Sequence, residues 1–309
     1  MKKTIFILLS FFLGLVFIIS GISKLFPIEP FEYQFVDIGV ASWNTAPYMA
    51  RFFIGIELFL GTMLLLNIAL RRFTLKFTVI LLTLFTFYLL FKIVTEGNTG
   101  NCGCFGEAIQ MSPLQGILKN LLLLLSSFVL YTLAEYEYWN SFWRKLLATI
   151  LLAGSMAIGF FVFPIDLVYT STLDKNHINY KVPLELMYTE KQKEKPKIEL
   201  RKGKHIIAFL SLTCSHCRIA AKKIHVMQKK NLSIPFYLAI NGDQEMVKDF
   251  FDDTHTQNIP HNLFLGPNEW TRVAGISLPI IMYINNGIVV KKCNGTDLNQ
   301  RDIEAWLIK

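Results

Sequence analysis

Long apolar runs dominate the first half of the sequence and constrain its fold more than any other feature. A transmembrane helix needs roughly 20 consecutive apolar residues. Five runs approach that length, and they cover approximately residues 4–20, 47–67, 73–94 and 113–133 and the stretch that ends near residue 164. The chain of 309 residues is 52% hydrophobic and contains 26 Phe, which is more apolar than a soluble globular protein usually is. The first half is therefore predicted to be an α-helical transmembrane bundle.

Basic residues fall on alternate loops between these runs. Arg71, Arg72 and Lys76 follow the second run, and Arg144 and Lys145 precede the fifth. By the positive-inside rule these loops and the N-terminus are cytoplasmic. The loop before residue 113 and everything after residue 164 are then expected on the outer face, in one compartment. We expect a multi-pass protein of the bacterial inner (cytoplasmic) membrane, in contact with membrane lipid, whose C-terminal part lies in the periplasm.

The same rule accounts for the formal net charge of +8. The sequence has no basic stripe interleaved with aromatic residues, so we expect no nucleic-acid partner. The first run has the basic start and small terminal residues of a signal peptide, but it is long for one. We favour an uncleaved helix. Residues 21–46, with Pro27 and Pro30, are expected to form an outer-surface loop.

A few ionisable residues interrupt the apolar runs. Arg51, Lys92 and Lys119 lie near the expected outer ends, where long side chains reach the interface. Glu57 is deeper and needs a partner, for which Lys119 or Lys92 is the expectation. A structural ion pair and the binding of a polar headgroup are both open for these residues. By polarity alone, Arg51, Glu57 and Lys119 are the candidate cofactor-binding residues.

Cysteines form two close pairs and leave one residue over. Cys102 and Cys104 flank Gly103 in the loop between the third and fourth runs. A disulfide between them requires a bend that glycine permits, so the bond is expected to be strained and easily reduced. The alternatives are two unconnected thiols or a copper or mercury site built on two thiolates. Cys293 is expected to be a buried structural thiol.

Three stretches carry a resemblance to known membrane proteins. They are Ser20-Gly21-Ile22-Ser23-Lys24-Leu25, Ala50-Arg51-Phe52-Phe53-Ile54-Gly55-Ile56-Glu57-Leu58 and Cys102-Gly103-Cys104-Phe105-Gly106. They resemble the DoxX and MauE families of four-helix membrane proteins associated with redox metabolism, and the cysteine loop points to the MauE branch. The resemblance covers about residues 1–135. It implies a four-helix core that works beside a thioredoxin-like partner, while a fifth helix within residues 136–166 is expected to tether the C-terminal part of the chain.

The remainder of the chain has the pattern of a soluble α/β domain. Residues 167–196 are expected to be a linker that includes the solvated connector 191–196, and residues 197–309 the domain. Strands are predicted at 205–210 and 234–240, and helices at 218–230, 244–251 and 302–308. A hairpin is predicted across Asn285-Asn286-Gly287.

Cys214-Ser215-His216-Cys217 stands between the first of these strands and its helix. A helix N-terminus stabilises a thiolate, so Cys214 is the predicted nucleophile and Cys217 the resolving thiol. His216 adds a local donor or positive charge that makes the pair more oxidising. A zinc half-site is the alternative, but no second pair lies nearby, and we expect no metal. The pattern resembles the thioredoxin fold, a likeness that covers about residues 180–309 and places Pro279 in the cis-proline loop beside the active site.

These features predict a membrane-bound thiol–disulfide oxidoreductase with redox-active disulfides. Periplasmic client thiols would reduce Cys214–Cys217, which would reduce Cys102–Cys104. The membrane half has no cysteine reachable from the inner side and no haem or Rossmann motif, so a membrane quinone is the expected acceptor. Two alternatives stay open. One is a periplasmic disulfide reductase, isomerase or maturation factor fed by another membrane protein, and the other is a non-enzymatic metal-binding membrane anchor.

Overall fold

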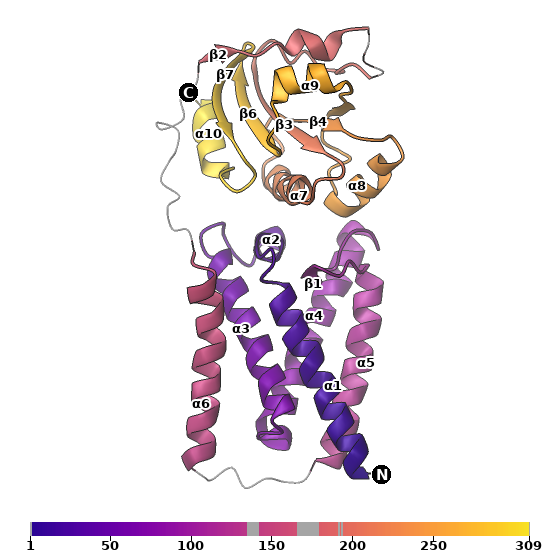
Figure 1. Ribbon diagram of the computed structural model, residues 1–309, viewed down its shortest axis with the longest axis vertical. Coiled ribbons are helices and arrows are strands. Elements are labelled where there is room, and N and C mark those ends of the chain that lie inside the picture. Colours follow the sequence, from indigo (N-terminus) through magenta and orange to yellow (C-terminus); the bar gives the residue numbers. More distant parts are fainter. Residues whose placement is uncertain (1, 135–141, 166–178, 191, 193, 309) are drawn as a thin grey trace. The chain divides into compact units, whose positions relative to one another are not determined.

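A computed structural model describes residues 2–134, 142–165, 179–190, 192 and 194–308 of the protein. The chain divides into two compact units, Met1–Ile165 and Asp166–Lys309. The first unit consists of helices and one short strand, and the second is a β-sheet with helices packed on it (Figure 1). This architecture confirms the predicted fold class, a helical membrane region followed by an α/β domain.

Among the described residues of the first unit, five helices are long and apolar enough to cross a membrane. They are α1 (Lys2–Ser23), α3 (Ala46–Leu65), α4 (Leu75–Glu96), α5 (Pro113–Leu133) and α6 (Phe142–Ala157), with π-helical turns at Leu70–Thr74 before α4 and Ile158–Val162 after α6. Large apolar side chains point outward from them, among which Phe87 and Phe128 are each 65% exposed and Phe161 is 84% exposed. Such surfaces are favourable in lipid, so the five predicted spans are confirmed.

Helices α1 and α3 cross closely because each has a glycine at the crossing point. A Cβ atom on Gly14 would lie 2.9 Å from the carbonyl oxygen of Gly61, and a Cβ on Gly61 would lie 3.0 Å from the carbonyl oxygen of Gly14. Small residues at helix crossings in membranes let the backbones approach and gain dispersion contacts. Leu13, Leu60 and Leu64 fill the adjoining core.

The predicted outer-surface loop contains a helix, which is a correction to the sequence analysis. Helix α2 spans Glu29–Asp37 and buries Phe31, Phe35 and Val36. Pro30 suggested a loop, but it occupies the first turn of α2, where proline is tolerated because its missing N–H has no intrahelical partner there. This helix covers one end of the bundle's interior.

The second unit is built on a six-stranded sheet with the order β2-β7-β6-β3-β4-β5. The strands are β2 (Tyr180–Lys181), β3 (Lys204–Ser211), β4 (Phe236–Asn241), β5 (His261–Leu263), β6 (Ile280–Asn285) and β7 (Ile288–Cys293). Strands β3, β4 and β5 run parallel, while β6 is antiparallel to both β3 and β7. A central parallel pair with an antiparallel hairpin beside it is the thioredoxin-like arrangement.

Four α-helices accompany this sheet: α7 (Ser215–Lys230), α8 (Met246–Thr254), α9 (Pro267–Ala274) and α10 (Gln300–Ile308). Successive strand residues point to opposite faces. On one face Phe209 and Tyr237 join the core that contains Trp270 of α9. Tyr283 points to the other face, where its ring packs against Trp306 of α10 at 5.4 Å between centroids. The predicted strands, helices and hairpin of this domain are confirmed.

The folded unit also includes part of the predicted linker. Strand β2 pairs with β7, and the 3-10 helix Leu184–Tyr188 buries Leu184 and Met187 in the core. Gln192 is buried rather than solvated, since its side chain exchanges hydrogen bonds with the backbone of Leu265 at 2.7 and 2.9 Å. The rest of the linker, 167–178, and residues 191 and 193 of the connector lie outside the described residues. Strands β2 and β5 and helix α9 were not predicted, because short segments carry too little periodicity.

Candidate functional site

The first cysteine pair lies at the start of α7, as predicted. Cys214 is the N-cap residue, and its Sγ accepts a hydrogen bond from the backbone N–H of Cys217 at 3.3 Å. Cys214 is half-buried, whereas Cys217 is fully buried. Burial and the hydrogen bond to Cys214 raise the pKa of the Cys217 thiol. This geometry suits an accessible attacking sulfur backed by a protected second thiol.

His216 and Pro279 are the residues expected beside this pair, and they lie in different environments. His216 is exposed to solvent, between the two cysteines. The Leu278–Pro279 peptide bond is cis, as the thioredoxin resemblance implied. Pro279 lies near α7, because a Cβ atom on Gly295 would contact both Ala220 of α7 and Pro279. The structure thus brings the cis-proline loop to the helix that carries the cysteines.

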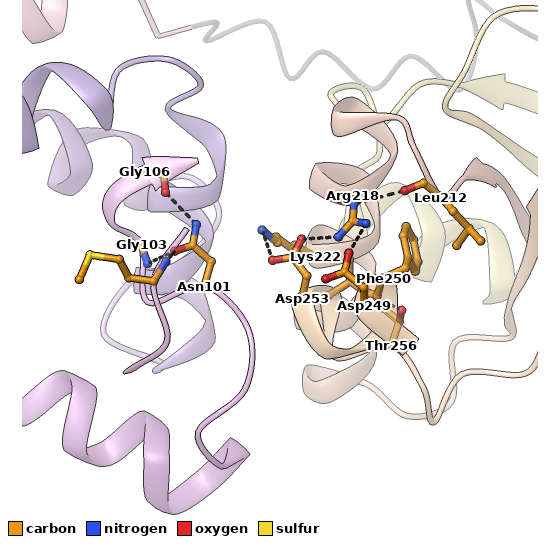
Figure 2. A network of polar contacts seen from close by, with 12 residues as sticks. Asn101, Gly103, Gly106, Leu212, Arg218, Lys222, Asp249, Phe250, Asp253 and Thr256 are labelled. Atoms are coloured by element: carbon orange, nitrogen blue, oxygen red, sulfur yellow. Dashed lines mark hydrogen bonds and ion pairs between the residues drawn. The ribbon is translucent and has the colours of Figure 1, made fainter. Parts of the chain in front are cut away.

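An ionic network between α7 and α8 was missed by the sequence analysis (Figure 2). Arg218 donates to the carbonyl oxygen of Leu212 at 3.3 Å and pairs with Asp249 at 2.7 Å and Asp253 at 3.4 Å. Lys222 pairs with Asp253 at 3.0 Å. The network joins α7 to α8 and fixes the backbone just before Cys214. The sequence does contain a signal for it. Two cations four residues apart on α7 match two anions four residues apart on α8, and residues at that spacing share one face of a helix.

The second cysteine pair lies in a loop between α4 and α5 that is organised by one side chain. Asn101 Nδ2 donates to the Gly106 carbonyl at 2.8 Å, and its Oδ1 accepts from the N–H of Gly103 at 3.1 Å and from that of Met111 at 3.4 Å (Figure 2). Asn101 is only 8% exposed. A short strand, β1 (Cys104–Glu107), follows. The Asn101 side chain thereby satisfies backbone groups of the loop that would otherwise need partners in a helix or sheet.

Gly103 is required here for two reasons. Its φ of +70° is in the left-handed region, and the side-chain amide of Gln34 from α2 occupies the place a Cβ would take. The bend predicted from the Cys-Gly-Cys spacing is therefore present. Cys102 is 2% exposed and Cys104 is partly buried, and both are free thiols.

The two loop sulfurs lie against α5, and the Cys102 sulfur also contacts the backbone of Cys104. A Cβ on Gly116 of α5 would be 3.1 Å from Cys104 Sγ and 3.2 Å from Cys102 Sγ. The backbone N–H of Cys104 donates to Cys102 Sγ at 3.3 Å. A hydrogen bond from the Cys102 thiol, helped by the charges of Lys119 and Lys24, lowers the pKa of the Cys104 thiol to about 6. The same bond and burial raise the pKa of Cys102 well above its usual range.

Glu57 has a partner other than the predicted ones. Lys24 at the end of α1 pairs with it at 2.8 Å, and both side chains are 3% exposed. Ser20 Oγ accepts from Lys24 at 2.6 Å and lies 2.9 Å from the Cys104 carbonyl oxygen. Sequence reasoning missed Lys24 because it follows the predicted first span and belonged to an expected loop. Helix α1 continues to Ser23, beyond the predicted end of the first span near residue 20. Lys24 follows it directly and pairs with Glu57.

The two lysines expected to pair with Glu57 have other contacts. Lys92 donates to the Asn101 carbonyl at 3.0 Å. Lys119 lies over the Phe105 ring at 4.8 Å from its centroid. Both are near the loop that carries Cys102, and neither forms the predicted ion pair.

A cavity of about 310 Å³ opens inside the helical unit beside the cysteine loop. Its wall is mainly apolar and includes several aromatic rings, among them Phe17, Phe31, Phe35, Phe53 and Phe85. Its polar lining consists of Ser20, Lys24, Gln34, Glu57, Tyr88, Lys119 and Asn120, and both Cys102 and Cys104 belong to the wall. Predominantly apolar pockets with a few convergent polar groups are typical small-molecule sites.

Arg51 does not line this cavity, so the structure separates it from Glu57 and Lys119. Its guanidinium pairs with Glu32 at 2.6 Å and donates to the Phe163 carbonyl at 2.8 Å. Arg51 is 4% exposed. It joins α3 to α2 and to the end of the helix that includes α6, and these contacts account for its burial.

Cys293, the unpaired cysteine, is 7% exposed at the end of β7. Burial raises the pKa of its thiol to about 12. This environment agrees with the predicted buried structural thiol.

The fold and the two thiol pairs define a multi-pass membrane protein that carries a thioredoxin-like domain. A family model described as "Methylamine utilisation protein MauE" matches residues 2–133. The chain is 32% identical to "Protein TlpB" of Flavobacterium psychrophilum over an alignment 357 positions long, gaps included, which covers 99% of this chain and 95% of that protein. The chain therefore belongs to the TlpB family, with a MauE-like membrane region. No solved structure matches the chain.

Proposed function

We propose that this protein is a membrane thiol–disulfide oxidoreductase that makes disulfides and passes the electrons to a quinone. In this proposal Cys214 and Cys217 oxidise client thiols, Cys102 and Cys104 reoxidise that pair, and a lipid-soluble quinone reoxidises the loop. The site of action is the periplasmic face of a bacterial inner membrane.

The observation that carries the proposal is the cavity whose wall contains both loop cysteines. An aromatic, mostly apolar chamber of about 310 Å³ within a membrane bundle suits a flat, apolar ring. Lys119 at its polar lining can donate a hydrogen bond to a ring oxygen, whereas the three donors of Lys24 already have acceptors on Ser20 and Glu57. A thiol pair and a hydrogen-bonding ring site in one chamber supply what electron transfer from sulfur to a quinone requires.

The number of spanning helices supports a meeting of the two cysteine pairs. Among the described residues, two helices long and apolar enough to span a membrane, α5 and α6, lie between the cysteine loop and the thioredoxin-like domain in the sequence, and an even number of crossings is what the proposed meeting requires. The presence of both pairs on one chain raises the effective concentration of each at the other, to roughly the millimolar range for short flexible linkers.

The chemistry balances as two thiol–disulfide exchanges and one two-electron transfer. Client thiols lose two electrons and two protons as their disulfide forms, and Cys214–Cys217 becomes a dithiol. The Cys214 thiolate then attacks one sulfur of the Cys102–Cys104 disulfide and releases the other as a thiol. Cys217 next attacks Cys214 in the mixed disulfide, which re-forms the Cys214–Cys217 disulfide and releases the second loop thiol. Loop reoxidation delivers two electrons and two protons to the quinone, which becomes a quinol.

Purified full-length protein, ubiquinone-1 and a reduced dithiol peptide provide the direct test. We expect the ultraviolet absorbance of the quinone to fall as the peptide is oxidised, and Cys104→Ala to lower the rate by on the order of 100-fold or more, because a covalent step is lost. Cys293→Ala is the matched control and should keep the rate, since that thiol is buried in the sheet.

Trapping thiols in cells tests the order of the relay. In Cys104→Ala, Cys214 and Cys217 should accumulate as the dithiol. If they stay oxidised in that variant, the internal relay is wrong. A resting dithiol in the unaltered protein, with no quinone consumption, would favour a reductase or isomerase. Metal that co-purifies only while Cys102 and Cys104 are present would favour a metal-binding anchor.

A further inference from the structure

Asn120 is a buried polar residue of α5 that the proposed relay does not yet use. It lines the cavity and is only 1% exposed. Its Nδ2 donates to Thr86 Oγ1 of α4 at 3.2 Å. Its Oδ1 has no hydrogen-bond partner among the described residues. A buried acceptor without a partner costs free energy, so its presence in a ligand-sized cavity calls for a physical reason.

The neighbouring hydroxyl fixes which way the Asn120 amide faces. Thr86 Oγ1 gives its single proton to the Leu82 carbonyl at 2.7 Å. It can therefore only accept from Asn120, and the amide must present an N–H to it. The amide cannot turn over without losing this bond, so Oδ1 remains the atom left for a ligand. Asn120 thus carries an acceptor without a partner on a residue of the cavity wall; the atom itself is buried, so a ligand reaches it by displacing a neighbouring part of the wall.

An acceptor discriminates between the two redox forms of a quinone. The ring oxygens of a quinone only accept hydrogen bonds, whereas the hydroxyl groups of a quinol also donate them. We propose that Asn120 Oδ1 accepts a hydrogen bond from a quinol hydroxyl, so that the cavity binds the reduced ring more tightly than it otherwise would. This inference rests on the proposed quinone-linked function, and it makes Asn120 a residue that favours the forward direction of electron transfer.

The test measures how tightly the protein binds the quinone and the quinol, each with the protein in a redox state that cannot react with that ligand. Oxidised full-length protein is titrated with ubiquinone-1, and reduced protein is titrated anaerobically with ubiquinol-1, with the thermal midpoint in detergent as the signal. For Asn120→Leu we expect the dissociation constant for ubiquinol-1 to rise about tenfold and that for ubiquinone-1 to change less than about threefold, as for the loss of one hydrogen bond.

Ligand-free stability separates a binding role from a structural one. Asn120→Leu removes the unpaired acceptor and leaves the bond between Thr86 and Leu82 intact, so the thermal midpoint without ligand should stay equal or rise. A structural role predicts a lower midpoint. Ser127→Ala is the matched control, because Ser127 is buried on the same helix, bonds to the Leu123 carbonyl of that helix at 2.8 Å and lies outside the cavity wall.

Thr86→Val provides a second variant if Asn120→Leu does not fold. Without the Thr86 acceptor the amide can turn, so the preference for ubiquinol-1 over ubiquinone-1 should shrink toward that of Asn120→Leu. Equal ubiquinol-1 binding by wild type and variant, with normal binding overall, overturns the role of Asn120 and leaves the proposed function standing. If neither ring form stabilises the wild-type protein, both the proposed function and this inference are wrong.

Discussion

The two cysteine pairs are positioned by different means. The Cys214–Cys217 pair depends on its own helix, since the backbone N–H that meets Cys214 Sγ belongs to Cys217, three residues on. The Cys102–Cys104 pair depends on its neighbour Asn101 and also on distant residues, with Ser20, Gln34 and Gly116 supplied by three other helices. One site is local in sequence, and the other also needs the tertiary fold.

The two pairs also differ in what shifts the pKa values of their thiols. The hydrogen bond from the Cys102 thiol has the largest effect on the pKa of Cys104, and the charges of Lys119 on α5 and of Lys24, just after α1, help to lower it to about 6. In the helix pair, burial is the main influence on Cys217, and it raises the pKa of that thiol. Charges from other helices thus add to the local bond from Cys102 at the loop pair, whereas burial and its own neighbours, and no charge from another helix, are the main influences on Cys217.

The buried ion pair between Lys24 and Glu57 gives the test of this comparison with the largest expected effect. In Lys24→Met the Glu57 carboxylate stays buried without its cation, and we expect a loss of about 3–5 kcal/mol of stability in the helical unit. Thermal unfolding in detergent measures the loss. The double change Lys24→Met with Glu57→Leu should recover most of it, because no uncompensated charge then remains. A stable single variant would contradict the assigned pairing.

The matched change in the other unit should be milder. Arg218→Met leaves Asp253 paired with Lys222, and Asp249 has a 72% exposed side chain. We expect about 1 kcal/mol of lost stability in the thioredoxin-like domain. An equal loss in the two units would remove the distinction between a buried charge left without its partner and a network in which Asp253 keeps one.

Asn101→Ala tests whether one side chain organises the cysteine loop. The change removes three hydrogen bonds and leaves the Gly103 N–H and the Gly106 carbonyl without that partner. We expect roughly 2–3 kcal/mol of lost stability and at least about a tenfold slower quinone reduction, while peptide binding to the Cys214 domain is unchanged. Rates and thermal midpoints measure both. Asn98→Ala is the control, since Asn98 accepts one exposed bond from the Leu114 N–H at 2.9 Å.

The same local-versus-tertiary distinction explains which structural features the sequence predicts. The spans, the Cys-x-x-Cys helix and the Asn286-Gly287 hairpin are predicted well because periodicity, capping and turn chemistry lie in neighbouring residues. Helix α2 was missed since proline within a first helical turn looks like a loop signal. Strand β2 has two residues and exists only through its pairing with β7.

The candidate site divides in the same way. The sequence named Cys102, Cys104, Glu57 and Lys119 from spacing and polarity, and the structure places all four on the cavity wall. It could not name Asn120, because an asparagine in an apolar run carries no signal of what it faces. Polarity also selected Arg51, whose partners, such as Glu32, are distant in sequence. Pairing between separated residues is the information that a single sequence lacks.

The pH dependence of Cys104 gives the most delicate test of tertiary tuning. With a pKa of about 6, Cys104 is a thiol below that pH and a thiolate above it, so its alkylation rate should rise through about pH 6 and level off near neutrality. Lys119→Met removes a charge that favours the thiolate, so the midpoint should move to higher pH by up to about one unit, equivalent to ~1.4 kcal/mol. Lys119→Arg should restore it. Peptide mapping after timed iodoacetamide treatment isolates the Cys104 signal, and Cys214 in the same sample should be unaffected by either change. A midpoint that stays fixed or falls in Lys119→Met would mean that the tuning of Cys104 is local to its loop after all, and the contrast between the two pairs would disappear.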